Sequence, residues 1–161
     1  MKATRILAAV AAMTFAGSAT LFAQTATQTV TFQVDAINQI SVSGSPTLDI
    51  NAAVAGSAPT SVATTGATWA VTTNQSNAKI TASIASAMPT GLTLSANASA
   101  PTGAASAGVK ALGTTAVDLV TGITKLNASG LALQYTLDAT AAAGVVSSTT
   151  RVVTYTITGG V

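Results

Sequence analysis

The sequence predicts an all-β fold, an antiparallel immunoglobulin-like β-sandwich of about seven to nine strands. Near the end of the chain, Leu131–Asp138 and Val153–Thr158 each alternate apolar and polar residues, which predicts strands with one apolar and one polar face. Shorter alternating stretches recur earlier, separated by Gly, Pro and Asn turn signals. We interpret the two C-terminal stretches as a hairpin. A two-stranded hairpin is marginal alone in water, so this one is expected to pack against a second sheet.

The first residues have the features of a secretory signal peptide, Met1–Ala23. Lys2 and Arg5 precede an apolar run, Ile6–Gly17, that is too short to span a bilayer. We expect cleavage after Ala23, with Ala19 as a second candidate. An uncleaved membrane anchor is the alternative, but no long apolar extension follows the run. The sequence therefore predicts a secreted protein, extracellular or at the cell surface, with the periplasm as an alternative location.

The expected mature chain, residues 24–161, is about the size of one domain, and we interpret it as a single β-sandwich. It contains no cysteine, so no disulfide stabilises it. The hydrophobic fraction of 48% overstates the core because much of it is alanine, and only 6% of residues are charged. Disorder is the alternative for a chain so rich in small residues, but sustained period-two alternation disfavours it.

The net charge of +2 and the pI near 9.3 depend on the signal segment. Without Lys2 and Arg5, the basic and acidic residues are equal in number: Lys79, Lys110, Lys125 and Arg151 against Asp35, Asp49, Asp118 and Asp138. A neutral surface offers no electrostatic attraction to phosphate backbones, so we expect no nucleic-acid partner. A net charge near zero also favours self-association.

The pattern predicts the following strands in the first half of the chain. Gln28–Ile37 alternates, with Val30, Phe32 and Val34 on one face. Ile40 and Val42 follow after a break at Asn38–Gln39, and Leu48 and Ile50 suggest a short strand. Asn51–Gly66 is predicted to be a loop with a brief strand near Val62.

In the second half, Thr68–Thr73 and Lys79–Ile84 are predicted to form a hairpin around Asn74–Asn77. The later strand candidates are Leu92–Leu94, Val109–Leu112 and Val117–Ile123. Asn127–Gly130 is predicted to be a turn before the C-terminal hairpin. One core is expected to contain Phe32, Val34, Trp69, Val71, Leu133, Tyr135, Val153 and Tyr155.

The absence of several residue types limits the possible chemistry. The chain has no histidine, cysteine or glutamate, which excludes Ser-His-Asp and Cys-His nucleophiles, thiolate or imidazole zinc sites and a Glu general acid. A pair of its four aspartates could form a carboxylate dyad, and Asp49-x-Asn51 could offer oxygens to calcium, but no acidic cluster supports either site. No phosphate-binding loop is present. We therefore expect no enzyme activity, no catalytic, cofactor-binding or metal residues, and no cofactor.

The aromatic residues disfavour a lectin or glycosidase. Phe32, Trp69, Tyr135 and Tyr155 all fall on the apolar side of their alternating stretches. Each is better interpreted as a core residue, whose burial contributes about 1.5–3 kcal/mol, than as a platform for sugar rings.

The signal segment, TVTFQVDAI and GVVSSTTRVVTYTIT resemble bacterial secreted or surface β-sandwich proteins, including fimbrial-subunit-like and cell-wall-associated domains. The resemblance extends in style over the whole mature chain. It implies a fibre-forming or surface-coat role.

Three hypotheses follow for function. The first is a secreted, non-enzymatic structural or cell-surface protein that self-assembles, with the strand Gln28–Ala36 pairing to a neighbouring copy. The second is an extracellular binding or adhesion module that contacts another surface protein or polymer through the loops Ala52–Gly66 and Ala98–Gly108. The third, an enzyme, is disfavoured by the missing acid–base residues. No membrane span is expected once the signal is cleaved.

Overall fold

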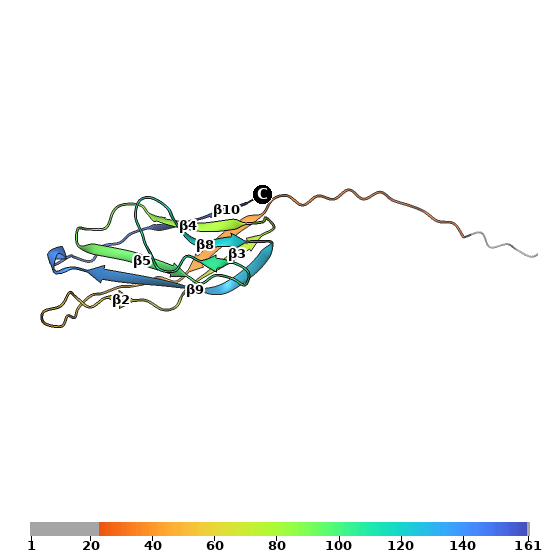
Figure 1. Cartoon of the computed structure of the whole chain (residues 1–161). Coiled ribbons are helices and arrows are strands. Elements are labelled where there is room, and N and C mark those ends of the chain that lie inside the picture. Colours follow the sequence, from red (N-terminus) through yellow and green to blue (C-terminus); the bar gives the residue numbers. More distant parts are fainter. Residues whose placement is uncertain (1–22, 161) are drawn as a thin grey trace, which may run out of the picture. The chain divides into compact units, whose positions relative to one another are not determined.

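The strands form two antiparallel sheets, as the computed structural model of residues 23–160 shows (Figure 1). The chain divides after Gln33 into two units, and the strands of the described residues all belong to the second. The six-stranded sheet has the order β1–β3–β9–β5–β7, with β2 also pairing with β9. Its strands are β1 (Asn38–Ser43), β2 (Val62–Ala63), β3 (Ala67–Thr73), β5 (Leu92–Ala98), β7 (Lys110–Ala111) and β9 (Leu126–Ala139).

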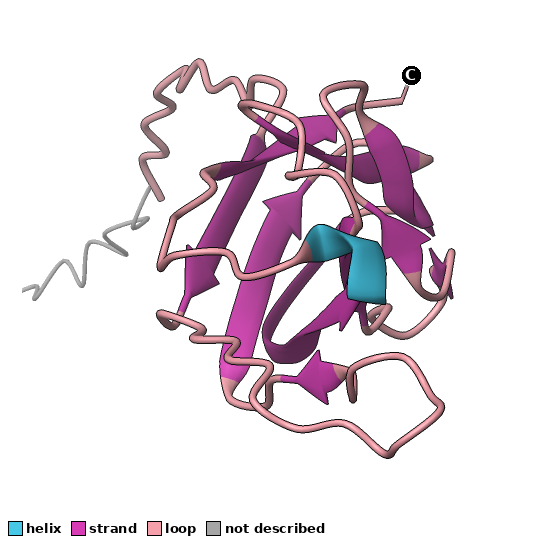
Figure 2. Cartoon of the chain, turned by 90° about the vertical axis from the view of Figure 1, so that its left-hand side faces the viewer, coloured by secondary structure: helices cyan, strands magenta, loops and turns pink. Residues whose placement is uncertain are grey.

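The four-stranded sheet has the order β10–β4–β8–β6. Its strands are β4 (Ala78–Ile84), β6 (Ala105–Ser106), β8 (Val117–Ile123) and β10 (Val153–Thr158). The helical structure in the described residues is one short 3₁₀ turn, Ala141–Ala143, which Figure 2 shows beside the strands. Within residues 23–160, no helix is long and apolar enough to cross a membrane. The structure thus confirms an all-β sandwich of antiparallel sheets, and immunoglobulin-like strand order stays a prediction.

The core lies between the two sheets, where the alternating apolar residues face one another. Trp69 and Val71 of β3 and Leu133 and Tyr135 of β9 are buried, as predicted. Ile80 of β4 and Leu119, Val120 and Ile123 of β8 approach them from the other sheet and are almost fully buried. Val153 and Tyr155 pack against this core but are only partly buried.

Two members of the predicted core lie outside it. Phe32 is 89% exposed and Val34 is 76% exposed, and residues 23–37 belong to no strand. The predicted first strand, Gln28–Ile37, is therefore wrong as an element of this domain. An alternating pattern specifies which side chains share a face, but it does not supply a neighbouring strand.

Both predicted hairpins are also wrong. β3 and β4 follow one another around Asn74–Asn77, but they lie in different sheets. β9 and β10 are likewise separated, because β3, β2 and β5 occupy both edges of β9 and leave no place for β10, which pairs with β4. Strand periodicity is the same in either sheet, so it could not distinguish a hairpin from a crossing between sheets.

The predicted turn at Asn127–Gly130 lies inside β9. The register between β3 and β9 shifts between Trp69 and Val71, and Gly130 has φ of 66°. Such a pairing shift with a left-handed glycine is typical of a β-bulge, which uses the same residue types as a turn. The bulge allows one long strand, Leu126–Ala139, where the sequence indicated a turn and a shorter strand.

Of the other short strands that the sequence predicted, some are confirmed and others are wrong. The brief strand near Val62 is confirmed as β2, and β5, β7 and β8 lie where strands were expected. The break predicted at Asn38–Gln39 is wrong, since both residues begin β1. Leu48 contacts the core from a loop, so the strand predicted at Leu48 and Ile50 is also wrong. The predicted signal segment lies outside the described residues, apart from Ala23.

Candidate interaction site

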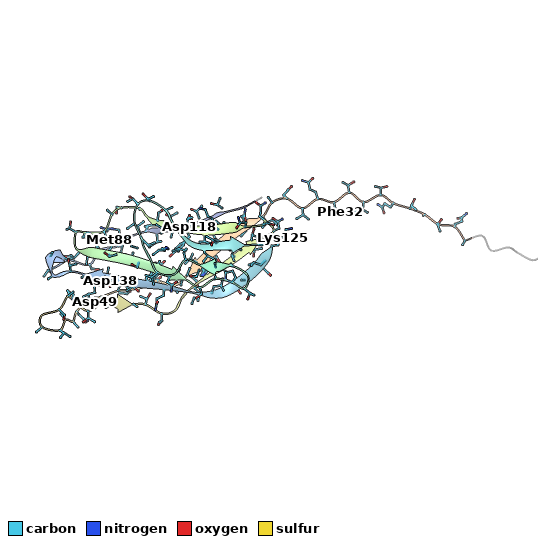
Figure 3. All side chains as sticks on the ribbon, in the orientation of Figure 1. Phe32, Asp49, Met88, Asp118, Lys125 and Asp138 are labelled. Atoms are coloured by element: carbon cyan, nitrogen blue, oxygen red, sulfur yellow. The ribbon has the colours of Figure 1, made fainter. Side chains whose placement is uncertain are left out.

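The segment that precedes β1, residues Gln28–Ala36, is the N-terminal tail. Val30, Phe32 and Val34 are 70%, 89% and 76% exposed and alternate with Thr31 and Gln33. Figure 3 shows Phe32 on this part of the chain, which runs as an extended ribbon without a strand arrow. Burying a Val or Phe side chain contributes about 1.5–3 kcal/mol of free energy, so covering this row of exposed apolar side chains would be strongly favourable. An exposed apolar row of this kind is typical of an interaction surface.

Asn74 holds the base of the tail against the domain. Its side-chain Oδ1 accepts a hydrogen bond from the Ile37 backbone N–H at 2.8 Å, and its Nδ2 donates to the Asp35 carbonyl at 2.7 Å. Its backbone N–H also donates to the Ile37 carbonyl at 3.2 Å. These bonds continue the β1–β3 ladder past the pair Asn38–Thr73. Asp35–Ile37 is therefore fixed in line with β1.

Strand β10 is an edge of the four-stranded sheet. It pairs with β4 on one side, and no strand among residues 23–160 pairs with its other side. The Ala85 N–H donates to the Val152 carbonyl at 3.1 Å, whereas the Ile84 N–H donates away from β10 to Gly113 at 2.9 Å. Because hydrogen-bonded pairs alternate in an antiparallel ladder, the backbone groups of Val153, Tyr155 and Ile157 point toward the open edge.

The side chains of β10 divide between its two faces. Val153, Tyr155 and Ile157 face the core and are partly buried, while the three threonines between and after them are exposed. This strand carries no lysine, proline or bulge, the features that usually protect an edge from pairing with another chain. Its row of apolar residues resembles the one on the N-terminal tail.

A tyrosine pair connects β10 to the opposite sheet. The hydroxyl of Tyr155 on β10 hydrogen-bonds that of Tyr135 on β9. Burial raises the pKa of Tyr155 well above its ordinary value near 10, and the hydrogen bond with Tyr135 raises it further. Burial also raises the pKa of Tyr135, by more than the hydrogen bond lowers it. Both phenols therefore stay protonated in the folded protein at pH values where they ionise in the unfolded chain.

We expect the stability of the domain to fall as the pH rises above about 10. Above that pH the unfolded chain releases phenolic protons that the folded protein retains, so the free energy of unfolding decreases by up to ~1.4 kcal/mol per pH unit for each tyrosine. Urea unfolding at pH 9 and pH 11 measures this loss. Tyr155→Phe should lose less stability than the parent chain between these two pH values. An equal loss in both would contradict the assignment of the pH dependence to the tyrosine pair.

The carboxylates are placed at separate positions in the fold. Asp118 on β8 forms a surface ion pair with Lys79 on β4 at 3.0 Å, each side chain being 45% exposed, and Asp138 on β9 accepts a hydrogen bond from Ser61. Within residues 23–160, no three His, Cys, Asp or Glu residues lie together in a way that could hold a metal ion. An exposed ion pair of this kind contributes about 0–1 kcal/mol of stability.

The two loops of the binding-module hypothesis are built from small residues. Ala52–Gly66 closes on itself through an Ala53–Pro59 bridge and contains β2. In Ala98–Gly108, the Ser106 hydroxyl donates to the Ala98 carbonyl at 2.7 Å, and the Trp69 indole N–H donates to the Ser99 carbonyl at 3.2 Å. Neither loop contains an aromatic residue or a carboxylate. Both loops therefore lack an aromatic or carboxylate cluster, which would favour ligand binding there.

A shallow depression of about 390 Å³ lies beside Ile37, the residue before β1. Ile37, Asn74, Lys125 and Leu126 are among its lining residues. It contains no carboxylate, and its one charged group is Lys125. This depression offers little for specific recognition of a small molecule.

Sequence patterning singled out Gln28–Ala36 but predicted a strand there, and it missed the open edge of β10, because that edge depends on which sheet receives the last strand. It also missed Asn74, whose signal was no more than that of a turn residue. Comparison with protein-family models, with curated proteins and with solved structures finds no match for this chain.

Proposed function

We propose that the protein is a secreted, non-enzymatic structural or cell-surface β-sandwich protein that self-assembles through its N-terminal tail. The observation that carries the proposal is the exposed row of Val30, Phe32 and Val34, which stands outside the strands of the described chain. In assembly, Gln28–Ala36 becomes a strand in a sheet of another copy. The surface location rests on the predicted signal segment, Met1–Ala23, and on the resemblance to bacterial surface proteins.

Strand addition suits both the backbone and the side chains of the tail. Adding a strand gains main-chain hydrogen bonds along the ladder and buries alternate side chains on one face. Thr29, Thr31 and Gln33 alternate with the apolar residues, so the other face of the added strand is polar. The equal number of basic and acidic residues after the signal also removes net-charge repulsion between copies.

The test compares Phe32→Asp with the parent chain, both starting at Gln24. The substitution places a charge where the proposal buries an aromatic ring. Loss of Phe burial alone, about 1.5–3 kcal/mol, weakens association roughly 10- to 150-fold, and a buried charge weakens it further. Sedimentation velocity over a range of concentrations and negative-stain microscopy measure the assembly state. We expect oligomers or filaments for the parent chain and monomers for Phe32→Asp at the same concentration.

The matched control is Thr31→Asp, which adds the same charge to the polar face of the tail. This variant should still assemble, with association weakened far less than in Phe32→Asp. Thermal melting verifies that the domain is folded in both variants, since both side chains are exposed. A parent chain that stays monomeric at millimolar concentration, or equal loss of assembly in both variants, would overturn the proposal.

A further inference from the structure

The two tyrosines of the chain meet between the two sheets. Tyr135 lies on β9 in the six-stranded sheet and Tyr155 lies on β10 in the four-stranded sheet, and their hydroxyl groups form a hydrogen bond. The sheets of a sandwich are about 10 Å apart, so rings that extend inward from both sheets can meet end to end. The hydrogen bond therefore connects the sheets through residues that are 20 positions apart in the sequence.

Small residues lie beside both aromatic rings. In the strand registers, Tyr135 is opposite Ala96 of β5 and Tyr155 is opposite Ala82 of β4, and each alanine is 1% exposed. Residues directly opposite one another share a face of the sheet, so an alanine there leaves room for the neighbouring ring. Tyr135 is buried, whereas Tyr155 is partly buried on an edge strand. Small molecules in the solvent can therefore reach the pair from the β10 side.

We propose that Tyr135 and Tyr155 form an oxidative cross-linking site, at which a peroxide oxidant joins the two rings as dityrosine. Each phenol loses one electron and one proton and becomes a phenoxyl radical. The unpaired electron is shared between the oxygen and the ring carbons ortho and para to it, and Cβ occupies the para position. One ortho carbon of each ring then forms the new carbon–carbon bond. The ortho hydrogens move to the oxygens through solvent and restore both phenols, while the two electrons and two protons convert one hydrogen peroxide into two water molecules.

The hydrogen bond favours coupling within the pair. Each ortho carbon is two bonds away from its hydroxyl oxygen, so the hydrogen-bonded hydroxyls keep the ortho carbons of the two rings within reach of each other after a rotation of the rings. Reactants held together in this way react much faster than the same groups diffusing in solution. The chain contains no further tyrosine that could compete for the radical.

The new bond braces a domain that has no disulfide. The chain contains no cysteine, so covalent bonds between its sheets cannot be formed by thiols. A link between Tyr135 and Tyr155 closes a loop that contains the β9–β10 connection, and it restricts the unfolded chain as a disulfide does. It also ties β10, which pairs only with β4 among the strands of residues 23–160, to the opposite sheet.

Photo-oxidation with a tris-bipyridyl ruthenium complex and persulfate, itself a peroxide, tests the site in the folded protein. The chain starts at Gln24 and carries Phe32→Asp, which leaves both tyrosines in place and disfavours contact between copies. It is illuminated at low concentration, and the product with the intact mass of a single chain is isolated. Coupling lowers this mass by two hydrogen atoms.

Digestion with trypsin locates the bond. Trypsin cleaves after Lys125 and Arg151, so the two tyrosines fall in separate peptides, 126–151 and 152–161. We expect mass spectrometry to find these two peptides joined, with a mass two hydrogen atoms below their sum. The linked chain, separated from the unlinked one, should unfold at a urea concentration about 1–3 M higher.

The matched controls are the same chain unfolded in concentrated urea and the chain with Tyr155→Phe in addition. Unfolding keeps both tyrosines but separates them, so the yield of joined peptides should fall at least about tenfold, and Tyr155→Phe should give none. Oxidation of the folded chain that leaves the two peptides separate, an equal yield from folded and unfolded chain, or links between chains alone would overturn the cross-linking site. An unchanged urea midpoint in the linked chain would overturn its role as a brace.

Discussion

Trp69→Ala is expected to remove about 3–5 kcal/mol from the free energy of unfolding. Trp69 is 3% exposed at the centre of β3, and its indole N–H donates to the Ser99 carbonyl, so alanine leaves both a cavity and an unpaired carbonyl. Domains of this size are stable by about 5–15 kcal/mol, and this one has no disulfide to offset the loss. The variant should therefore be marginally folded or unfolded at room temperature.

Urea unfolding followed by far-UV circular dichroism measures the effect. Trp69→Phe is the matched variant, because it keeps most of the buried area and loses the hydrogen bond, and it should cost about 1–2 kcal/mol. Thr68→Ala changes the neighbouring residue on the outer face of β3 and should cost less than either. A Trp69→Ala variant that melts within a degree of the parent would contradict the packing of the core.

The sequence predicted the strands and their buried faces where a strand buries one face and leaves the other more exposed. In β3 and β4, alternation indicated both the segments and their core side chains, including Trp69 and Ile80, because burial on one face imposes a period of two. The same rule could not assign these strands to sheets. Asn74–Asn77 has the composition of a hairpin turn, yet it carries the chain from one sheet to the other.

Of the two parts of the candidate site, the N-terminal tail and the β10 edge, only the tail could be recognised from the sequence. The tail was recognisable from the alternation of Val30, Phe32 and Val34, but the pattern was interpreted as a strand of the core, since periodicity is the same for a strand with a partner and a segment without one. The β10 edge and the Asn74 bonds depend on contacts between residues far apart in sequence. Local propensity contains no information on such contacts.

The second large effect is expected in the tail itself when copies associate. In the single chain, the amides of Gln28–Phe32 belong to no ladder and should exchange with solvent at rates near those of an unstructured peptide. After strand addition, every second amide of Gln28–Ala36 donates to the acceptor strand and becomes protected. Each 1.4 kcal/mol of local stability slows exchange about tenfold, so a burial gain of a few kcal/mol predicts slowing by at least about tenfold.

Hydrogen exchange of the tail amides, measured by mass spectrometry with residue-level fragmentation, is the most direct test of self-assembly through the tail. The chain starting at Gln24 is measured below and above the concentration at which it associates, beside Phe32→Asp as the variant that should not respond. We predict alternating protection in Gln28–Ala36 that appears only in the associated parent chain. Association that leaves the tail amides exchanging as fast as in the monomer would contradict the account.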